Sequence, residues 1–368
     1  MINYYNKINF MKIAFITNAI RNDMTGVGVY SKGLIDAFLK LYPQNKYIFI
    51  DFEKNNFNKK YLFLIKNPLP TKKMSLWFNY VALKLRNEKI DYIFNLTGTP
   101  HIVSFKQKEI FVIHDFHQIL YPQFTTFRTF LYNKFFLFSS LNKSFRIIVN
   151  SNKTKNELMN LFKISPQKIF KLYLPFFNKK IRKPKKNISF PYLLTISNID
   201  LRKNIKNLVS AFNLIKKNKE NIPHKLIIIG KPGYGFKEII QYIKESPFYK
   251  DVILTGYLPD EEKNYLLSKA SVFIYIPFYE GLGIPILEAA YFKIPIISSP
   301  IPAAIEILKK NLFLVNPNNI NGIQSQIKKA IFFGYQREKI NKSFSIVNKI
   351  KSNQNIKKQI DEFLFILR

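Results

Sequence analysis

Short apolar runs alternate with amphipathic stretches along most of the chain, a pattern that predicts parallel strand–helix–strand units. In the first half, the runs predicted as strands are Ile13–Thr17, Tyr47–Asp51, Tyr92–Leu96, Ile110–Ile113 and Arg146–Val149. In the second half, they are Tyr192–Ser197, Lys225–Gly230, Val252–Thr255, Val272–Tyr275 and Ile294–Ser298. Each half has enough strands for a sheet of its own, which predicts an α/β fold with two Rossmann-like, doubly wound domains.

A basic, proline-bearing stretch separates the two halves, Asn178–Pro191, and is interpreted as an interdomain linker. We expect an N-terminal domain over residues 11–180, a C-terminal domain over 181–345 and a C-terminal helix within 346–368. In that last segment Ile356–Leu367 has its apolar residues on one helical stripe, and the N-terminal domain is one surface against which it can pack. Because doubly wound sheets bind ligands at the carboxyl ends of their strands, the chemistry is expected in a cleft between the two domains.

Composition narrows the class of protein. The chain has 368 residues, of which 47% are hydrophobic and 22% charged, so a wholly disordered protein is excluded. The absence of cysteine excludes disulfides, thiolate metal sites and cysteine nucleophiles. No window has about 18 uncharged apolar residues, so no spanning helix is predicted and a cytoplasmic location is expected. The first residues lack an apolar signal core, and Met11 is an alternative to Met1 as the start.

The formal net charge of +35 suggests an anionic partner, either nucleic acid or an acidic membrane. However, 36 Phe and 21 Tyr accompany only one Trp and 12 Gly, which indicates codons rich in A and T as the main source of the lysines. None of the usual nucleic-acid-binding motifs is present. Two basic and aromatic stretches remain, Met74–Leu85 and Phe124–Phe145, and each is interpreted either as a membrane-surface helix or as a helix packed on its own sheet.

The first glycine cluster follows the first predicted strand and contains Gly26 and Gly28. Ser31 occupies the position where the dinucleotide fingerprint needs its third glycine, which disfavours a nicotinamide or flavin cofactor. No phosphate-loop motif is present either. The cluster is interpreted as a flexible loop over a phosphate or an acceptor, or else as a plain strand-to-helix turn.

A second site is predicted in the segment YIPFYEGLGIPILE, where a helix is expected from near Pro285. Glu280 lies in the loop and Glu288 about one turn into the helix. Three backbone amides beside Glu280 form a predicted nest for an anion or a hydroxyl: those of Gly281, Leu282 and Gly283. Two carboxylates beside such a nest favour a ligand with hydroxyl groups, such as a sugar or a ribose. The alternative is two solvated glutamates beside a loop-to-helix turn.

A third site is the Arg202-Lys203 pair after the Tyr192–Ser197 strand. At a helix start, two cations and free backbone amides suit a pyrophosphate. Surface charge at a helix start is the alternative.

Taken in order, these segments resemble the retaining glycosyltransferases of family four, which have the two-domain GT-B fold. The resemblance extends over almost the whole chain and rests on MKIAFITN, GVGVY, His114-Asp115, Asn150-Ser151, LRKNI, TGYLPDEE, EGLGIPILEAA and PIISSPIPAAIEI. The sequence departs from the family pattern at Ile276-Pro277, and also at Lys293 and Lys309, where the family often has glycine.

The resemblance implies a nucleotide-sugar donor bound mainly by the second domain. Arg202 and Lys203 would contact its diphosphate and Glu288 its ribose, while Glu280 and the Gly281–Gly283 amides would contact the donor sugar. From the first domain, His114 would touch the donor sugar, and Gly26 and Gly28 would line the phosphate and acceptor side.

The implied reaction is retaining and metal-independent. The departing phosphate helps to deprotonate the acceptor, and the two cations stabilise the leaving group. The sequence has no Asp-x-Asp triplet, so a metal-bridged diphosphate is not expected. No cofactor is expected. The HDF and EGLGIPILEAA segments most resemble the mannosyltransferase branch of the family, which implies GDP-mannose as the donor in preference to UDP- and dTDP-sugars. The acceptor would be a glycan or a lipid-linked glycan of envelope polysaccharide, including lipopolysaccharide, with peripheral attachment at the inner face of the plasma membrane. A nucleic-acid-binding protein and an inactive scaffold remain the alternatives.

Overall fold

The computed structural model describes residues 10–54, 57, 61–67, 74–173, 180–184, 188–217, 222–332 and 337–367. Two compact units divide the chain, and each contains one sheet. The first unit comprises residues up to 119, residues 128–176 and residues 356–368. The second comprises residues 120–127 and 177–355. Residues 178, 179 and 185–187 of the predicted linker lie outside the described residues.

The first unit contains a parallel sheet with the strand order β3-β2-β1-β4-β5-β6-β7. Its strands are β1 (Lys12–Ile16), β2 (Lys46–Asp51), β3 (Leu62–Leu64), β4 (Tyr92–Asn95), β5 (Lys108–Ile113), β6 (Arg146–Val149) and β7 (Ile169–Lys171). Its helices are α1 (Gly26–Leu41), α2 (Met74–Lys84), α3 (His117–Leu120), α4 (Phe127–Lys143), α5 (Asn152–Phe162) and α13 (Asn353–Leu367), with the 3-10 turn η2 (Pro166–Lys168).

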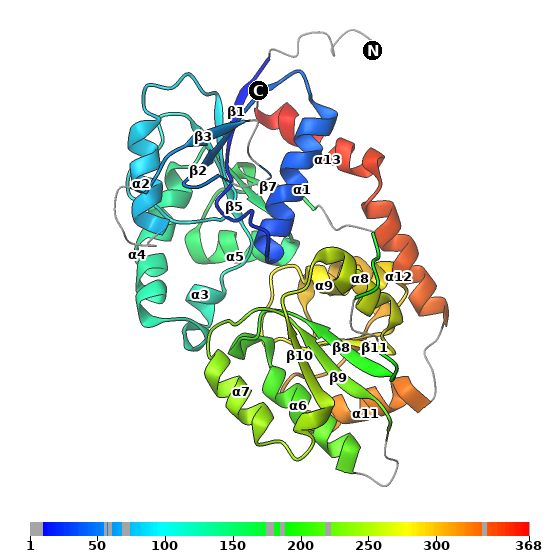
Figure 1. Ribbon diagram of the computed structural model, residues 1–368. Helices are drawn as coiled ribbons and strands as arrows, with labels where there is room; N and C mark the ends of the chain where they lie inside the picture. Colours follow the sequence, from blue (N-terminus) through cyan, green and yellow to red (C-terminus); the bar gives the residue numbers. More distant parts are fainter. Residues whose placement is uncertain are drawn as a thin grey trace. The chain divides into compact units, whose positions relative to one another are not determined.

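Helices cover both faces of this sheet (Figure 1). On one face, Trp77 and Phe78 of α2 are fully buried against Ile93 and its neighbours. On the other face, α13 packs through Phe363 onto Phe94, and the predicted stripe of Ile356, Ile360, Phe363, Leu364 and Leu367 is buried throughout. The terminal helix of the sequence therefore belongs to the core of the first unit.

The second unit repeats this plan with the strand order β10-β9-β8-β11-β12-β13, again parallel. Its strands are β8 (Tyr192–Ile196), β9 (Lys225–Ile229), β10 (Val252–Gly256), β11 (Val272–Tyr275), β12 (Ile296–Ser298) and β13 (Phe313–Leu314). Its helices are α6 (Ile205–Lys217), α7 (Phe236–Lys244), α8 (Asp260–Lys269), α9 (Ile284–Tyr291), α10 (Pro302–Leu308), α11 (Ile320–Phe332) and α12 (Arg337–Ile350), with the 3-10 turns η1 (Pro122–Phe124), η3 (Leu201–Lys203), η4 (Tyr249–Asp251) and η5 (Lys309–Asn311).

Both sheets confirm the predicted doubly wound architecture. In each, the first strand lies between the second and the fourth, so chain winding reverses between β1 and β4 and again between β8 and β11. Loops that follow the two strands at such a reversal diverge and leave a crevice at the carboxyl edge, where ligands of this architecture bind.

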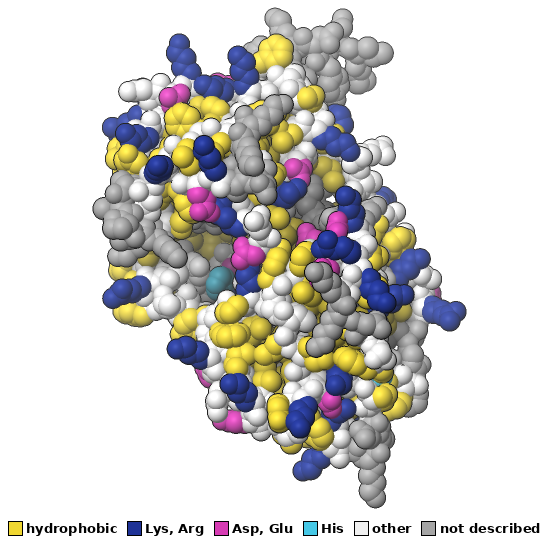
Figure 2. All heavy atoms as spheres, in the orientation of Figure 1, with side chains coloured by type: hydrophobic (Ala, Val, Ile, Leu, Met, Phe, Trp, Pro, Cys, Tyr) yellow, Lys and Arg dark blue, Asp and Glu magenta, His cyan; other side chains and the backbone are white. Residues whose placement is uncertain are grey.

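The two basic and aromatic stretches both form helices, but they differ in how far their aromatic side chains are buried. The first forms α2, which packs on its own sheet as one of the two interpretations expected. The second forms α4, where Phe135 and Phe138 remain 66% and 47% exposed. None of the described helices combines the length and the apolar character needed to cross a membrane. Figure 2 shows Lys and Arg side chains scattered over the visible face, which fits a compositional origin for most of the charge.

Candidate functional site

The loops after β8 and β11, the two strands at the reversal of the second sheet, are joined by hydrogen bonds. The Phe278 amide donates to the Arg202 carbonyl at 2.9 Å, and Arg202 Nη1 donates to the Tyr279 carbonyl at 2.7 Å. Buried Asn204 donates through Nδ2 to the Ile276 carbonyl at 3.1 Å. Positions of the side chains on these loops are therefore fixed before any ligand binds.

Two cations surround one carboxylate at this junction. Arg202 Nη1 lies 3.1 Å from Glu280 Oε2, and Lys203 Nζ forms an ion pair with the same oxygen. All three side chains are at most 15% exposed. Burial and the Arg202 charge lower the pKa of Lys203, whereas Glu280 and Asp200 raise it. Arg202 and Lys203 are therefore two nearly buried cations held side by side, an arrangement that suits an anionic ligand.

Tyr275, the last residue of β11, completes this cluster and was not singled out from the sequence. Its hydroxyl donates to Glu280 Oε2 at 2.9 Å and accepts from Lys203 Nζ at 2.8 Å. Burial and the Glu280 charge raise its pKa well above the ordinary value, so the phenol stays protonated. In the sequence this tyrosine ends a run of apolar residues, which indicates only a core position. The partners of its hydroxyl become known only from the structure.

The structure corrects one local prediction about the cations. Arg202 and Lys203 lie in the turn η3, not at the start of α6, which begins at Ile205 after Asn204 in the left-handed conformation, φ 60°. The Lys203 amide already donates to Asp200 Oδ1 at 3.1 Å. This amide is therefore not free for a pyrophosphate, and the side chains remain the groups available at this position.

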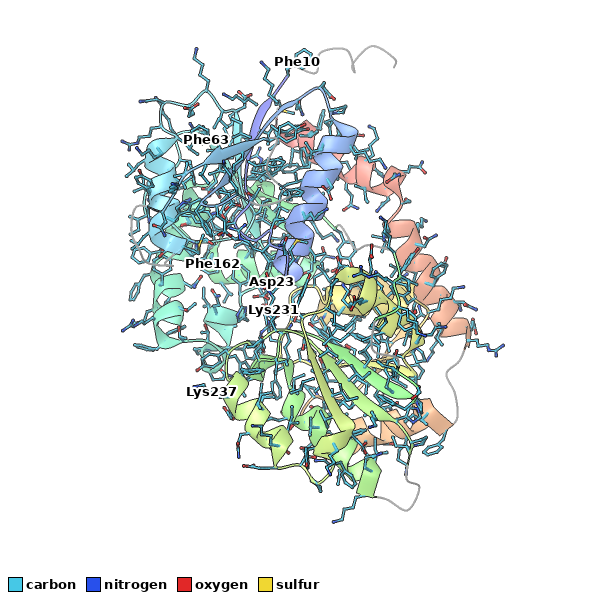
Figure 3. All side chains as sticks on the ribbon, in the orientation of Figure 1. Phe10, Asp23, Phe63, Phe162, Lys231 and Lys237 are labelled. Atoms are coloured by element: carbon cyan, nitrogen blue, oxygen red, sulfur yellow. The ribbon has the colours of Figure 1, made fainter. Side chains whose placement is uncertain are left out.

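The glycine-bearing loop after β9 packs against the loop that holds η3. A Cβ atom at Gly230 would lie 1.6 Å from the Ser197 carbonyl oxygen, so the backbones approach more closely than any side chain allows. The Leu201 amide donates to the Tyr234 carbonyl at 3.0 Å, across the same contact. Figure 3 shows Lys231, which follows β9, and Lys237 in the first turn of α7.

The loop that holds the predicted nest lies beside Glu280 and leads into α9. Gly283 has φ 76° and precedes α9, which starts at Ile284 beside Pro285 and confirms the predicted helix. Within the described part of the chain, three amides have no protein acceptor, those of Gly281, Leu282 and Gly283. Three unpaired donors next to a carboxylate can bind an oxygen-rich ligand.

Glu288 is buried in α9, where it pairs with a lysine that the sequence analysis did not consider. Lys263 Nζ of α8 lies 2.7 Å from Glu288 Oε1 and 3.0 Å from Asp260 Oδ1. Burial opposes the charge of Lys263, but the carboxylates of Glu288 and Asp260 outweigh it and raise the pKa of Lys263. The sequence signal for this pair is limited to the run of acidic residues before Lys263.

His114 belongs to the first unit, after β5 at the carboxyl edge of the sheet. Its Nε2 lies 2.8 Å from the Leu96 carbonyl, and its ring meets the edge of Tyr30. Burial lowers the pKa of His114, whereas the Leu96 hydrogen bond and Asp115 raise it. Since a carbonyl can only accept, Nε2 carries the proton and Nδ1 of the neutral ring is an acceptor. Asp115 instead accepts from His117 Nδ1 at 2.6 Å.

The first glycine cluster does not form the flexible loop that was one of its two interpretations. Gly26 and Gly28 lie in the first turn of α1, and a Cβ atom at Gly28 would lie 2.5 Å from the Ala19 carbonyl oxygen. The turn from β1 into α1 is therefore tightly packed, as the second interpretation expected. Beside it, Arg21 donates to both oxygens of the fully buried Asp51 at 3.1 and 2.8 Å, an ion pair that the sequence analysis did not identify.

Comparison with known proteins is consistent with this geometry. Residues 176–343 match the family model for "Glycosyl transferases group 1". The chain is similar to the O-antigen chain mannosyltransferase B of Escherichia coli, with 26% identity over 353 residues that cover 87% of this chain and 91% of that protein.

Two solved structures share the fold. The sucrose-phosphate synthase of Thermosynechococcus elongatus superimposes with a TM-score of 0.76 at 16% identity and covers 97% of this chain and 99% of its own. HepE of Anabaena, solved with UDP and glucose, gives a TM-score of 0.72 at 17% identity and covers 96% of this chain and 99% of its own. The GT-B prediction is therefore confirmed.

Proposed function

The chain belongs to the group 1 glycosyl transferases, hexosyltransferases of polysaccharide synthesis, and from that premise we propose that it transfers mannose from GDP-mannose to a glycan or lipid-linked acceptor. The single observation that supports a nucleotide-sugar site best is the cluster of Arg202 and Lys203 around Glu280 at the strand-order reversal. GDP-mannose is favoured because the similar Escherichia coli protein is named a mannosyltransferase.

In this proposal, the diphosphate of the donor binds Arg202 and Lys203. Both side chains are held against Glu280 by the joined loops, so little ordering is needed when the ligand arrives. A diphosphate supplies several oxygens to the guanidinium fork and the ammonium, which gives charge-assisted hydrogen bonds. As the glycosidic bond breaks, negative charge grows on the same oxygens, and the two cations stabilise it.

The donor sugar lies at Glu280 and the nest. The carboxylate accepts hydrogen bonds from sugar hydroxyls, and the three unpaired amides of residues 281–283 donate to sugar or phosphate oxygens. Glu288 accepts from the ribose hydroxyls, and Lys263 holds its carboxylate in place through a 2.7 Å hydrogen bond. Each role assigned to a residue here is part of the proposal.

The first unit supplies His114, whose neutral ring offers Nδ1 as an acceptor to a donor-sugar hydroxyl. Gly26 and Gly28 lie in the first turn of α1, and we assign them to the phosphate and acceptor side of the donor. The acceptor hydroxyl attacks on the face from which the phosphate departs, and a departing phosphate oxygen takes its proton, which retains the anomeric configuration. The residues proposed for this step supply the charge stabilisation themselves, so activity in excess chelator is expected.

We also propose that the exposed face of α4 touches an anionic membrane surface. Phe135 and Phe138 lie three residues apart on it, and the exposed cations Arg128 and Lys134 flank them. Aromatic rings that enter the interface beside lysines and arginines suit peripheral binding to acidic lipids. A lipid-linked acceptor would be reached from such a surface.

A thermal-shift panel of GDP, UDP, dTDP, CDP and ADP tests the proposed donor. GDP should raise the melting temperature most, because binding to the folded state alone stabilises it. A larger shift with another base would move the donor to that base. A response to polyanions alone, lost with added salt, would favour nucleic-acid binding instead. Binding without turnover or donor hydrolysis would favour an inactive scaffold.

A further inference from the structure

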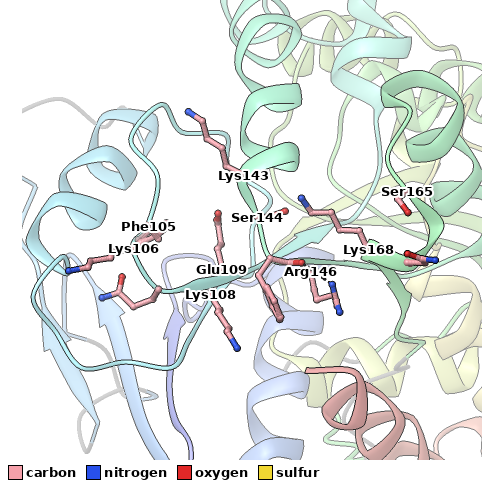
Figure 4. Close-up of a pocket in the computed structure, with 12 residues that line it drawn as sticks. Phe105, Lys106, Lys108, Glu109, Lys143, Ser144, Arg146, Ser165 and Lys168 are labelled. Atoms are coloured by element: carbon pink, nitrogen blue, oxygen red, sulfur yellow. Dashed lines mark hydrogen bonds between the residues drawn. The ribbon is translucent and has the colours of Figure 1, made fainter. Parts of the chain in front are cut away.

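An open, charged cavity lies at the edge of the first sheet opposite His114. It has a volume of about 520 Å³ and is lined by residues 105–109, 143–146, 165, 167 and 168 (Figure 4). These residues precede or begin β5, β6 and β7, so the cavity lies at the amino ends of parallel strands. His114 lies at the carboxyl end of β5 and therefore at the other edge of the sheet. We call this cavity the β5–β6 pocket.

The β5–β6 pocket is strongly basic. Its lining includes five cations, Lys106, Lys108, Lys143, Arg146 and Lys168. In the described part of the chain none of the five forms an ion pair. Four of them meet carbonyls or rings instead: Lys168 Nζ donates to Asn142 O at 2.7 Å, Lys143 Nζ to Ile102 O at 3.1 Å and Arg146 Nη2 to Ile366 O at 3.3 Å, and Lys108 Nζ lies 4.9 Å from the Phe145 ring centre. The charges are therefore available to a ligand.

The one acidic side chain of the pocket does little to balance them. Glu109 is 4% exposed, and burial raises its pKa to about 8, although Asn95 and Lys168 oppose the shift. Its Oε1 accepts from Asn95 Nδ2 at 3.2 Å and lies 3.0 Å from His101 Nε2. At neutral pH the glutamate is therefore mostly a neutral acid.

Both faces of the strand contribute cations. Ile110 pairs with Arg146 in the parallel register, so Arg146 and Lys108 share a face and Glu109 lies on the other. Figure 4 shows Lys108 and Arg146 extending to one side of the strands while Glu109 and Lys168 extend to the other. An occupant at this edge could meet positive charge from both sides.

We propose that the β5–β6 pocket binds a phosphate-bearing ligand, a site separate from the one proposed for the donor. Several lysines and one arginine around a single cavity suit the many oxygens of a phosphate or diphosphate. A volume of about 520 Å³ exceeds the need of a bare phosphate and leaves room for the group attached to it. The phosphate can come from a free metabolite or from a lipid headgroup.

Lysine acetylation read by mass spectrometry tests this proposal residue by residue. One arm adds inorganic pyrophosphate, and the other adds phosphatidylcholine vesicles with or without phosphatidic acid. Either probe should slow acetylation of Lys106, Lys108 and Lys143 by about threefold or more at a concentration several times its Kd. Exposed Lys40, Lys84 and Lys89 of the same unit serve as controls. Protection by pyrophosphate assigns a free anion, and protection by acidic vesicles alone assigns a headgroup.

A matched pair of variants makes the test independent of the donor site. Lys106→Gln/Lys108→Gln/Lys143→Gln should abolish pyrophosphate or vesicle binding at the pocket, whereas Lys40→Gln/Lys84→Gln/Lys89→Gln, with the same loss of charge, should keep it. Binding can be followed in both through protection of Lys168. Equal acetylation of the pocket lysines with and without both probes, or equal protection of the control lysines, would overturn the proposal. Neither result bears on Arg202 or Glu280, so the proposed donor site stands or falls separately.

Discussion

Lys203 Nζ donates a 2.8 Å hydrogen bond to the hydroxyl of Tyr275 and lies 5.2 Å from the centre of its ring. The tyrosine ends β11, whereas the lysine lies in the loop after β8, so the contact links the two strands at the reversal. Because the same hydroxyl donates to Glu280, Tyr275 fixes both the cation proposed for the diphosphate and the carboxylate proposed for the sugar. We expect it to act as a positioning residue.

Tyr275→Phe keeps the ring and removes the hydroxyl. Two hydrogen bonds within the cluster are lost, so nucleoside diphosphate binding should weaken by about tenfold, equivalent to about 1.4 kcal/mol. Isothermal titration calorimetry measures this directly, with exposed Tyr249→Phe as the control. Unchanged affinity in Tyr275→Phe would show that Lys203 needs no support from the strand.

Removing Lys263 alone should destabilise the second unit more than removing the charges of both Lys263 and Glu288. Lys263→Met leaves a buried carboxylate without its lysine and should cost about 3 kcal/mol, whereas Lys263→Met/Glu288→Gln should recover much of the loss. Calorimetric unfolding of the two variants and the wild-type protein gives the comparison. A double variant no more stable than the single one would show that the pair is not the cause.

Glu109 should make the first unit less stable as pH rises. Its pKa is about 8 when folded, against an ordinary value of 4.5, so the folded state holds the proton that the unfolded state loses between these values. Stability due to this proton is present below pH 4.5 and is lost toward pH 8. The difference in unfolding free energy between Glu109→Gln and the wild-type protein should therefore be about 2 kcal/mol or more larger at pH 8 than at pH 5, in favour of the variant.

The single tryptophan makes that measurement specific to the unit. Trp77 is fully buried in the first unit, so its fluorescence during urea unfolding reports this core. His101, which contacts Glu109, has its pKa lowered to about 4 by burial and by Lys143, so its ring is mostly neutral in the folded protein at both pH values. Exposed Glu88→Gln is the control. An equal gain at both pH values would contradict the assignment.

Lys309→Gly should stabilise the second unit. Lys309 has φ 52° and ψ −128°, a conformation that strains any residue with a Cβ atom, and its side chain is exposed. The backbone strain that glycine removes should exceed the entropic cost of glycine by about 1 kcal/mol. Neighbouring Lys310→Gly, where φ is not positive, should destabilise instead. Melting temperatures of the two variants provide the comparison, and the same sign in both would refute the explanation.

The exposed face of α4 should control vesicle binding. Phe135→Ser/Phe138→Ser should reduce flotation with acidic vesicles, because two rings no longer enter the interface. Phe365→Ser in α13, also exposed, should have no effect. Absence of flotation in the wild-type protein at low salt would remove the membrane proposal, while nucleotide binding would be unaffected.

The sequence was sufficient for the architecture because apolar runs and amphipathic stretches alternate so regularly. It was also sufficient for the loop at Glu280, since proline and glycine constrain the backbone locally. Strands β3, β7 and β13 were not predicted because they have only two or three residues and little or no apolar repeat. Two departures from the family pattern, Lys293 and Lys309, proved to be lysines at positive φ, where glycine is favoured.

Contacts between distant segments were beyond the sequence. Lys263 meets Glu288 only because α8 and α9 pack together, and Tyr275 meets Lys203 only because β11 adjoins β8. Gly26 and Gly28 were open to two interpretations, since glycine allows both a mobile loop and a close approach, and neighbouring Ala19 decides between them. Side-chain partners of this kind require the sheet order, which periodicity does not give.

The most direct measurement of the central claim is calorimetric titration of the nucleoside diphosphate that gives the largest thermal shift. Wild-type protein should bind about one equivalent, and Arg202→Ala and Lys203→Met should each weaken binding by about tenfold to a hundredfold, since each removes charge-assisted hydrogen bonds. Arg182→Ala removes a 57% exposed arginine of the same unit and should bind as the wild type does. If Arg202→Ala and Lys203→Met bind as tightly as wild type, the diphosphate site is not at this cluster.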